Sequence, residues 1–483
     1  MKILFATSEA APFIKSGGLG DVMGALPPEL SKNKENEIAV ILPYYDKIKY
    51  GNNEGIEFLT SFSVPLAWRE CHVGIFKAEV KKKGAGKRKG TCVTYYFVDN
   101  EDYFCRGTLY GCDDDGERFA YFSKAILEAI SHIDFIPDII HCNDWQTGFV
   151  PLFLKAHYND IEAYRNIKTV YTIHNIEYQG KAMPDFLQNV LGVSENFRNV
   201  ATQDDMINAM KCAIVLCDKL TTVSKTYANE IGFEYYAHGL SAIISENAYK
   251  TKGIINGIDT DVFNPAKDTK LEFNFAPNKM SGKAKCKESM QKALGLPVCD
   301  APMVAMITRL VSHKGLELVE WVADNLANMG IQFVVLGTGD SRYEELFRNL
   351  AYLHPETVSA NIMFDATMAS RLYAASDFFL MPSKSEPCGL SQLIAMRYGS
   401  VPIVRETGGL YDTVQPLNTE TLEGRGFTFK VFNAHDMLNA VERARDFYYE
   451  GDKLARHRIN LMKLNFDWSA PAEEYMQLYK ELQ

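Results

Sequence analysis

Short runs of apolar and β-branched residues alternate with helix-like segments along the first half of the chain. Each run ends in polar residues, and the runs lie at 3–8, 38–43, 138–143, 169–174 and 219–224. Apolar residues with helical spacing separate them, as in residues 119–131 and 145–158. Continuous apolar runs of this kind indicate buried parallel strands. We therefore expect an α/β fold with a doubly wound sheet, in which ligands bind beyond the carboxyl ends of the strands.

A second alternating block begins near Gly253. Its strand-like runs lie at 303–308, 332–337, 378–382 and 401–404. A polar, lysine-bearing connection over 264–297 is expected to be a hinge region, and residues 468–483 have the pattern of one amphipathic helix. We expect two Rossmann-like domains facing across a deep cleft: residues 1–250, joined by the C-terminal helix 468–483, and residues 251–467.

Residues 52–110 depart from this alternation because they are rich in aromatic and β-branched residues. The basic run 81–89 lies between two strand-like segments, which predicts an inserted hairpin with an exposed tip. Such a charge run is usually a solvated loop; a role in holding an acidic partner is the alternative.

Composition narrows the class of protein. The 483 residues carry a net charge of −10, which argues against a nucleic-acid-binding surface over the whole molecule. No apolar run approaches the roughly 18 residues of a membrane span, and the N-terminal residues do not form an export signal. The ten cysteines include no CxxC pair. We expect a cytoplasmic protein with free thiols and no metal site, acting on neither nucleic acid nor membrane.

A glycine-rich turn, KSGGLGD at 15–21, follows the first predicted strand. Gly17 and Gly18 allow a ligand close to the backbone, and the N–H groups that open the next helix suit an anion. Lys15 adds a positive charge, and Asp21 follows the glycines. The alternative interpretation is a tight strand-to-helix turn in which the glycines serve packing alone.

Two neighbouring predicted strands end in polar clusters. The first is HCNDWQTG at 141–148, which contains Asp144, and the second is His174 with Asn175. Asp144 could simply cap a helix, and a histidine at a strand end is often a packed core residue. Two such clusters on adjacent strands favour a common site instead.

The second block carries the cationic residues Arg309 and Lys314 in TRLVSHKG, directly after a predicted strand. A guanidinium fork and an ammonium point charge could neutralise a diphosphate, although two solvated surface cations are the alternative. Glu386 precedes Pro387 at the start of a helix, where a carboxylate also serves as a structural cap. Residues 407–410 form a second glycine-rich turn of the anion-binding type.

Two further patterns are set aside. Asp113, Asp114 and Asp115 resemble a metal-binding carboxylate set, but they lie in a loop with no strand before it. Residues 337–340 lack the third glycine of a dinucleotide fingerprint, because position 342 is Arg. A dehydrogenase is therefore a weak alternative.

Together these motifs resemble the glycogen and starch synthases of bacteria and plastids. They occur in the family's order over essentially the whole chain: KSGGLGDV (15–22), HCNDWQTG (141–148), YTIHNIEYQG (171–180), LTTVSKTYANEI (220–231), INGID (255–259), TRLVSHKG (308–315) and EPCGLSQLIAMRYGSVPIVRETGGLYDTV (386–414).

The resemblance implies a GT-B glycosyltransferase that moves glucose from a nucleotide-glucose donor to the non-reducing end of an α-1,4-glucan, with retention of configuration. It implies that the donor lies mainly on the second domain and the acceptor on the first, and that the domains close over the reaction. No cofactor or metal is expected. ADP-glucose is favoured as the donor, with UDP-glucose as the alternative.

The resemblance also implies roles for single residues. Arg309 and Lys314 would bind the donor diphosphate. Glu386 would hold the glucose hydroxyls, and His174 would form a hydrogen bond with the transferred glucose. Asp144 would position the sugar or the acceptor. The remaining expected contacts are with the phosphates, the sugar and the acceptor: Lys15, Gly17, Gly18, Asp21, Asn175, Cys388, Gly389, Leu390, and the N–H groups of Thr407, Gly408 and Gly409.

Two points stay open. Many retaining GT-B enzymes place a second Glu eight positions after the first, where this chain has Ile394, so the ribose contacts are not assigned. No carboxylate is evident as a nucleophile for a double displacement, so we favour a front-face substitution in which the leaving phosphate takes the acceptor's proton. A binding module without catalysis, and a related enzyme acting on another acceptor, are the competing hypotheses.

Overall fold

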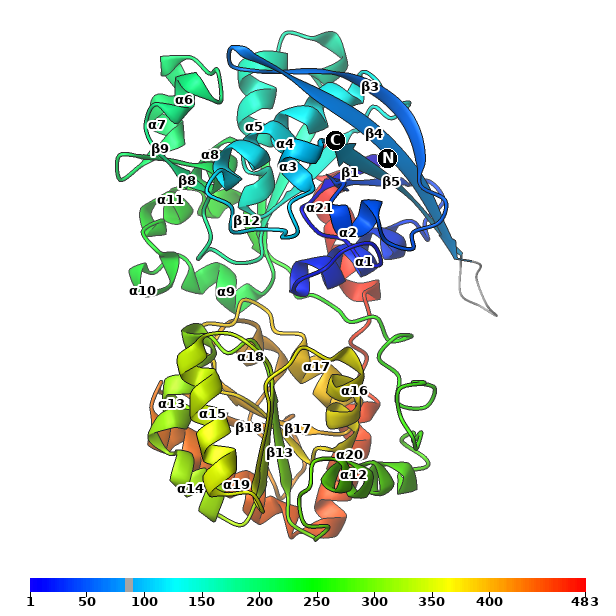
Figure 1. Ribbon diagram of the computed structural model, residues 1–483, viewed down its shortest axis with the longest axis vertical. Helices are drawn as coiled ribbons and strands as arrows, with labels where there is room; N and C mark the ends of the chain where they lie inside the picture. Colours follow the sequence, from blue (N-terminus) through cyan, green and yellow to red (C-terminus); the bar gives the residue numbers. More distant parts are fainter. Residues whose placement is uncertain (83–89) are drawn as a thin grey trace. The chain divides into compact units, whose positions relative to one another are not determined.

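The computed structural model describes residues 1–82 and 90–483, which form two compact units (Figure 1). Unit 1 comprises Met1–Asn256 together with Trp468–Gln483, so the end of the chain returns to it. Unit 2 comprises Gly257–Asp467. Each unit has its own hydrophobic core around its own sheet, as expected of independent domains.

Unit 1 is built on a nine-stranded sheet with the order β12-β11-β7-β6-β1-β2-β5-β4-β3. All neighbouring pairs from β12 to β5 are parallel. The strands are β1 (Lys2–Ala6), β2 (Glu37–Pro43), β3 (Glu57–Leu66), β4 (Arg69–Lys82), β5 (Thr91–Asp99), β6 (Ile139–Asn143), β7 (Lys168–Ile173), β11 (Lys219–Thr222) and β12 (Thr251–Gly253). The parallel α/β architecture predicted for this half is thus confirmed.

The predicted hairpin is present at the edge of this sheet. Strand β4 pairs antiparallel with β5, Lys82 lying opposite Thr91, and antiparallel with β3 on its other side. The remainder of the basic run, 83–89, lies outside the described residues.

Helices cover both faces of the unit 1 sheet. Helix α1 contacts β2, β5 and α21, whereas α5 contacts both α4 and α8. These helices are α1 (Gly18–Leu30), α4 (Asp115–Ile130), α5 (Val150–Phe153), α8 (Ala209–Leu216) and α21 (Ser469–Lys480). Shorter elements complete the unit: α2 (Asp46–Lys49), α3 (Glu101–Phe104), α6 (Phe186–Asn189), α7 (Arg198–Ala201), α9 (Lys225–Glu230), α10 (Glu234–Ala237), α11 (Ser241–Glu246), and a small sheet of β8 (Lys181–Ala182), β10 (Met206–Asn208) and β9 (Thr202–Gln203).

The single helix predicted over residues 145–158 is wrong. The segment is divided into a 3₁₀ turn at Trp145–Thr147, the α5 turn, and a π-helical turn at Leu154–Tyr158. Pro151 explains the break, because it has no N–H to continue a helix from the preceding residues and instead fits the first turn of a new one.

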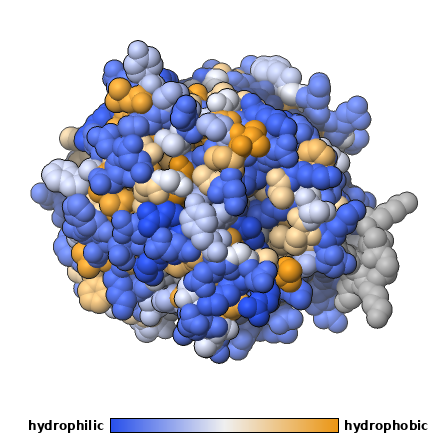
Figure 2. All heavy atoms as spheres, turned by 90° about the horizontal axis from the view of Figure 1, so that it is seen from below, coloured by the Kyte–Doolittle hydropathy of each residue, from blue (hydrophilic) through white to orange (hydrophobic). Residues whose placement is uncertain are grey.

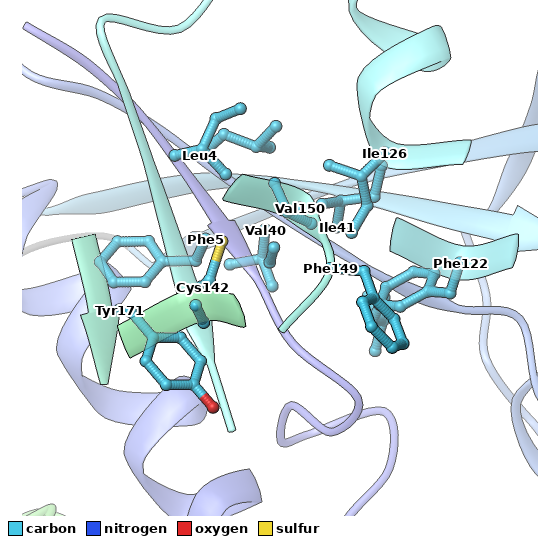
Figure 3. Close-up of a cluster of buried hydrophobic side chains, with 14 of the residues drawn as sticks. Leu4, Phe5, Val40, Ile41, Phe122, Ile126, Cys142, Phe149, Val150 and Tyr171 are labelled. Atoms are coloured by element: carbon cyan, nitrogen blue, oxygen red, sulfur yellow. The ribbon is translucent and has the colours of Figure 1, made fainter. Parts of the chain in front are cut away.

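The core of unit 1 lies between the central strands and the helices on one face. Figure 3 shows side chains from β1, β2, β6 and β7 beside those of α4 and the residues that open α5. The labelled residues are buried: Leu4, Phe5, Val40, Ile41, Phe122, Ile126, Cys142, Phe149, Val150 and Tyr171. Their burial explains why the strands read as continuous apolar runs in the sequence.

His141 connects the C-terminal helix to the sheet. Its Nδ1 lies 2.6 Å from the hydroxyl of Tyr479 in α21, and its Nε2 lies 2.5 Å from the hydroxyl of Thr172 in β7. Burial lowers the pKa of His141 to about 3, so the ring is neutral and each nitrogen has a hydroxyl partner. His141 therefore has a structural role, because both of its ring nitrogens are bonded within unit 1.

Unit 2 contains a parallel six-stranded sheet with the order β15-β14-β13-β16-β17-β18. The strands are β13 (Met303–Ile307), β14 (Gln332–Leu336), β15 (Val358–Asn361), β16 (Phe378–Met381), β17 (Val401–Arg405) and β18 (Phe427–Phe429). The four predicted strands occur as expected. The two edge strands, β15 and β18, were not predicted: β15 is short and weakly apolar, and β18 has only three residues.

Two groups of helices cover the two faces of this sheet (Figure 1). One group is α13 (Leu316–Trp321), α14 (Ala323–Asn328), α15 (Ser341–Leu353) and α19 (Ala434–Tyr448). The other is α12 (Ser281–Ala293), α16 (Ala366–Ala375), α17 (Ser391–Arg397) and α20 (Gly451–Met462). A short helix, α18 (Gly408–Thr413), follows β17.

The hinge expected over residues 264–297 is wrong in one respect, because the segment contains helix α12, packed within unit 2. Lys283 in α12 is buried, and its ammonium group donates to three carbonyl oxygens of unit 2. These acceptors belong to Ala374, Ser376 and Tyr398. The lysines that made this segment appear solvated in the sequence include one that anchors the helix.

Figure 2 shows a face on which hydrophilic residues predominate, with hydrophobic residues scattered singly or in small groups among the described residues. Scattered apolar residues of this kind are normal on a protein surface. Within residues 1–82 and 90–483, no helix combines the length and the apolar character needed to cross a membrane.

Candidate functional site

Arg309 lies on an exposed turn directly after β13. The next residue, Leu310, holds this turn in place: its N–H donates to the carbonyl of Thr338 at 2.8 Å, and its carbonyl accepts from the N–H of Asp340 at 2.8 Å. No described residue forms an ion pair with the Arg309 guanidinium. A fixed backbone with an unpaired cation is the arrangement that an anionic ligand requires.

The glycines at 337 and 339 pack against this turn. A Cβ at Gly337 would overlap with the carbonyl oxygen of Thr308, and a Cβ at Gly339 would overlap with that of Leu310. The GTGD segment is therefore explained by close backbone contact with the turn that carries Arg309. The dehydrogenase alternative loses the one motif that supported it.

Lys314 and Glu386 form a partly buried ion pair. The ammonium group of Lys314 donates to both carboxylate oxygens of Glu386, at 3.0 and 2.8 Å, and Ser383 donates its hydroxyl to the same carboxylate at 2.8 Å. Burial acts to raise the pKa of Glu386, but Lys314 and Ser383 outweigh it, so the pKa lies below its ordinary value. Glu386 is therefore an ionised acceptor and not a proton donor.

The glycine-rich turn at 407–409 packs onto the loop that carries Glu386. A Cβ at Gly408 would overlap with the carbonyl oxygen of Glu386, and a Cβ at Gly409 would overlap with that of Cys388. The N–H of Gly409 donates to the carbonyl oxygens of Glu386 and Pro387. The N–H of Thr407 donates to the carbonyl oxygen of Arg405. Both N–H groups are thus bonded within the protein in this structure, and their contact with phosphate stays a prediction.

Two buried side chains that the sequence analysis missed also support this loop. Arg405 donates to the carbonyls of Ser383 and Lys384, at 3.4 and 2.7 Å, and Gln392 donates to those of Cys388 and Gly389, at 3.1 and 2.9 Å. A charged residue closing the apolar run of β17 was the available signal for Arg405. Both side chains therefore fix the backbone of the loop that carries Glu386.

Three more residues expected to contact the substrate follow Glu386 in the sequence. Gly389 has a left-handed backbone, with φ of +70°, and Leu390 directly precedes α17. Cys388 is buried. Ile394, which replaces the second Glu of related enzymes, is a buried residue of α17, so its side chain is packed into unit 2.

In unit 1, Asp144 has a left-handed backbone with φ of +55°, which is rare for a residue other than glycine. Its Oδ1 accepts hydrogen bonds from the N–H groups of His174, at 2.7 Å, and Asn175, at 3.2 Å. Burial raises the pKa of Asp144 to about 7, although these two bonds lower it. The two predicted strand-end clusters thus do meet, and among described residues no donor contacts Oδ2 of Asp144.

His174 is held in one tautomer. Its Nε2 lies 2.9 Å from the amide oxygen of Asn143, whose NH₂ group donates to the carbonyls of Ala6 and His141. An amide oxygen only accepts, so Nε2 carries the proton and Nδ1 is an acceptor. Burial lowers the pKa of His174 to about 3, so this histidine is neutral at physiological pH.

A cavity of about 330 Å³ lies beside this cluster. Trp145 lines it, next in sequence to Asp144, together with the half-exposed ring of Tyr178. The other lining residues are Glu177, Gln179, Gly180 and Lys181. A Cβ at Gly180 would overlap with the indole of Trp145, which explains the glycine there. Aromatic faces beside polar groups suit a sugar.

The turn at 15–21 lies at the start of α1. Lys15 and Asp21 form an ion pair at 2.8 Å, and both are substantially exposed. A Cβ at Gly17 or Gly18 would meet open space, so a ligand can approach this backbone. The N–H groups of Ser16 and Gly17, however, donate to the carboxylate of Glu9. Of the expected anion contacts, Gly18 remains available and the N–H of Gly17 is engaged.

The aspartates set aside above form ion pairs. Asp114 pairs with Arg106 and Asp115 with Arg118, both at 2.5 Å. Within residues 1–82 and 90–483, no group of His, Cys, Asp and Glu residues has the geometry to hold a metal ion.

Comparisons with known proteins show the family of the chain. The model of the starch synthase catalytic domain matches residues 2–246, and the model of group 1 glycosyl transferases matches residues 291–454. The chain is 47% identical over 485 residues to glycogen synthase of Desulforamulus reducens, covering 100% of this chain and 99% of the relative. It is 44% identical to glycogen synthase of Ligilactobacillus salivarius, with complete coverage of both chains.

Solved structures give the same result. The catalytic domain of starch synthase IV from Arabidopsis thaliana, bound to ADP and acarbose, has a TM-score of 0.90 and 34% identity, covering 100% of this chain and 99% of that one. Sucrose-phosphate synthase from Thermosynechococcus elongatus has a TM-score of 0.62 at 17% identity, covering 100% and 98%, a likeness of fold alone. The predicted GT-B fold is confirmed, and the chain belongs to the glycogen and starch synthase family of glucosyltransferases.

Proposed function

We propose that the chain transfers glucose from ADP-glucose to the non-reducing end of an α-1,4-glucan, with retention of the anomeric configuration. The choice of ADP is supported by the Arabidopsis starch synthase, whose structure contains ADP and acarbose. UDP-glucose remains the alternative donor. The observation that carries the proposal is the grouping of Arg309, Lys314 and Glu386 on the carboxyl-end loops of one parallel sheet.

In this proposal the donor diphosphate binds Arg309 and Lys314. Arg309 has no ion-pair partner among the described residues, so it can bind phosphate oxygens without first giving up another contact. Lys314 is already paired with Glu386, which leaves the pair electrically neutral and positions both groups before the donor arrives. The two cations then stabilise the negative charge that develops on the departing nucleotide.

Glu386 and His174 are proposed to bind the transferred glucose. Ionised Glu386 accepts hydrogen bonds from sugar hydroxyls and offsets positive charge at the anomeric carbon. Neutral His174 offers the unprotonated Nδ1 as a second acceptor. Asp144 offers Oδ2, while its Oδ1 stays bonded to the backbone of residues 174 and 175.

The acceptor glucan is proposed to bind unit 1 at the cavity beside Trp145 and Tyr178. The cavity combines aromatic faces for sugar rings with the polar groups of Glu177 and Lys181. This proposal places the acceptor next to Asp144, which directly precedes Trp145 in the sequence. Lys15 and the start of α1 are proposed to contact an anionic oxygen of the donor.

The proposed chemistry is a front-face substitution. The bond between the anomeric carbon and the phosphate oxygen breaks, the acceptor's O4 bonds to the same carbon from the same face, and the O4 proton passes to the leaving phosphate. No protein base is required. The rate then depends on positioning and on electrostatic stabilisation of the leaving group.

The experiment compares initial rates with ADP-glucose and UDP-glucose at equal concentrations, with glycogen as primer. We expect ADP-glucose to be used at least about tenfold faster. Equal rates, or a preference for UDP-glucose, would refute the donor assignment. Tight glycogen binding with no transfer from either donor would favour the binding module instead.

A further inference from the structure

Glu9 occupies the space beneath the KSGG turn. It lies just beyond the carboxyl end of β1, and only 3% of its surface is exposed. Its carboxylate accepts hydrogen bonds from the N–H of Ser16, from the hydroxyl of Ser16 at 2.7 Å, and from the N–H of Gly17 at 3.3 Å. A buried carboxylate with these donors fixes two consecutive peptide groups of the turn.

Tyr110 closes the arrangement from a distant loop. Its hydroxyl donates to the carboxylate of Glu9 at 2.6 Å and lies 2.8 Å from the hydroxyl of Ser8. Burial, with the nearby charge of Glu9, raises the pKa of Tyr110 well above its ordinary value, so the phenol keeps its proton. Because that proton goes to Glu9, the hydroxyl of Ser8 donates to Tyr110.

This bonding divides the N–H groups of the turn into two sets. Those of Ser16 and Gly17 face Glu9, whereas those of Gly18 and Leu19, in the first turn of α1, have no acceptor among the described residues. Gly20 explains the tight turn, since a Cβ there would overlap with the side chain of Lys15 and approach Glu9. The backbone is held on one side and open on the other.

We infer that Glu9, assisted by Tyr110, is a positioning residue for donor binding. It orients the turn so that Lys15 and the free N–H groups of Gly18 and Leu19 face the anionic part of the nucleotide-glucose. Glu9 itself touches no substrate. This inference rests on the proposed function for the identity of the ligand, and on the contacts above for the positioning.

The charge of Glu9 also reaches the second part of the unit 1 site. Burial is the main reason for the raised pKa of Asp144, and the negative charge of Glu9 adds to it. Glu9 therefore lies within electrostatic range of both the KSGG turn and Asp144. One buried group is placed to influence both parts of the site in unit 1.

The test uses the full-length chain with the substitutions Glu9→Gln and Tyr110→Phe. Glu29→Gln is the matched control, because Glu29 is an acid of α1 whose one ion pair among the described residues is with Lys32, three residues away. Two quantities are measured: amide hydrogen exchange of residues 14–20, and the separate kcat and KM values for nucleotide-glucose and for glycogen.

We expect Glu9→Gln to accelerate exchange at Ser16 and Gly17 and to raise KM for nucleotide-glucose about tenfold, with KM for glycogen changed less than about twofold. Tyr110→Phe should give a smaller change in the same direction, and Glu29→Gln should give none. A purely structural role would reduce the active fraction without separating the two KM values.

Unchanged exchange at residues 16 and 17 in Glu9→Gln, or equal effects on both KM values, would overturn the inference. If Glu9→Gln does not fold, Tyr110→Phe carries the same test. Hydrogen exchange does not depend on turnover. An unmodified chain without transferase activity would refute the proposed function, while exchange would still decide whether Glu9 holds the turn.

Discussion

The ammonium group of Lys314 contacts both carboxylate oxygens of Glu386, although the two residues are 72 positions apart in the sequence. The exposed fractions of their side chains are 18% and 9%, so each charge depends on the other for compensation. Ser383 completes the coordination of the carboxylate. This ion pair joins the loop after β13 to the loop after β16, and it forms before any ligand binds.

Lys314→Ala should destabilise the fold as well as abolish transfer. The substitution leaves the buried carboxylate of Glu386 without its cation, which costs about 3–5 kcal/mol of unfolding free energy. Lys292→Ala is the control, because the Lys292–Glu288 pair is exposed to solvent and contributes little to the free energy of unfolding. Urea unfolding of both variants measures the difference.

The effect of Lys314→Ala should also depend on pH. Since the pKa of Glu386 is lowered in the folded protein, the pair's stabilisation is present above the unfolded pKa of the carboxyl and is lost as pH falls through the folded pKa. The gap in stability between wild type and variant should therefore shrink in acid. A gap that is constant with pH would contradict the ion pair.

Arg309→Ala should separate binding from stability. Because Arg309 is exposed and has no ion-pair partner among the described residues, its removal should change the unfolding free energy by less than about 0.5 kcal/mol. Loss of a charge-assisted phosphate contact worth about 1.5–3 kcal/mol should lower kcat/KM about 10- to 100-fold. Calorimetric titration with ADP measures the lost affinity directly, and unchanged affinity would remove Arg309 from the site.

Asp144 should give the reaction an ionisation near pH 7. The ionised carboxylate is the better acceptor for sugar hydroxyls, so activity should fall as pH drops through about 7. Asp144→Asn should be less active and should lack this step. The pH profile of kcat measures it, with Asp324→Asn, an exposed aspartate, as control.

The raised pKa of Asp144 also makes the stability of the fold depend on pH. The folded pKa of Asp144 is raised above its unfolded value, so its contribution is fully present below about pH 4 and is lost as pH rises through about 7. His141 and His174, with pKa values lowered to about 3, act in the opposite sense below pH 6.5. Comparing wild type with Asp144→Asn at pH 5 and pH 8 isolates the aspartate, and an identical difference at both values would contradict the raised pKa.

A pair of glycine substitutions should distinguish packing from ligand approach. Gly409→Ala places a Cβ against the carbonyl of Cys388 and should displace the Glu386 loop, lowering both stability and activity. Gly18→Ala meets no protein atom, so it should leave the melting temperature unchanged while raising KM for the donor. Differential scanning fluorimetry and steady-state kinetics measure the two effects. A lowered melting temperature in Gly18→Ala would show that this glycine serves packing.

The parallel strands were predictable because a strand buried on both faces gives a continuous apolar run, as in residues 38–43. The strand-end clusters at Asp144 and His174 were predictable for the same reason. Helix α12 was not, because its surface is mostly lysine and polar residues and its anchor, Lys283, looks solvated in the sequence. Intrinsic pattern does not reveal a lysine whose acceptors are about 90 or more residues away.

Glu9 illustrates the corresponding limit for the site. An acid just beyond a strand end has no distinctive local signal, and its partner Tyr110 lies 101 residues further along the chain. The bonding of Gly409 to Glu386 was hidden in the same way, since the TGG pattern fits both an anion-binding turn and a packed one. Residue types identified the candidates, but only the folded backbone shows which donors are already used.

Transfer of labelled glucose tests the central claim most directly. Radiolabelled ADP-glucose is incubated with glycogen and the protein, and the product is digested with β-amylase, which releases maltose from non-reducing α-1,4 ends. The account predicts stoichiometric release of ADP, label in the polymer, and recovery of that label as maltose, all lost in Glu386→Gln. Absence of label from the polymer, or label that β-amylase does not release, would contradict it.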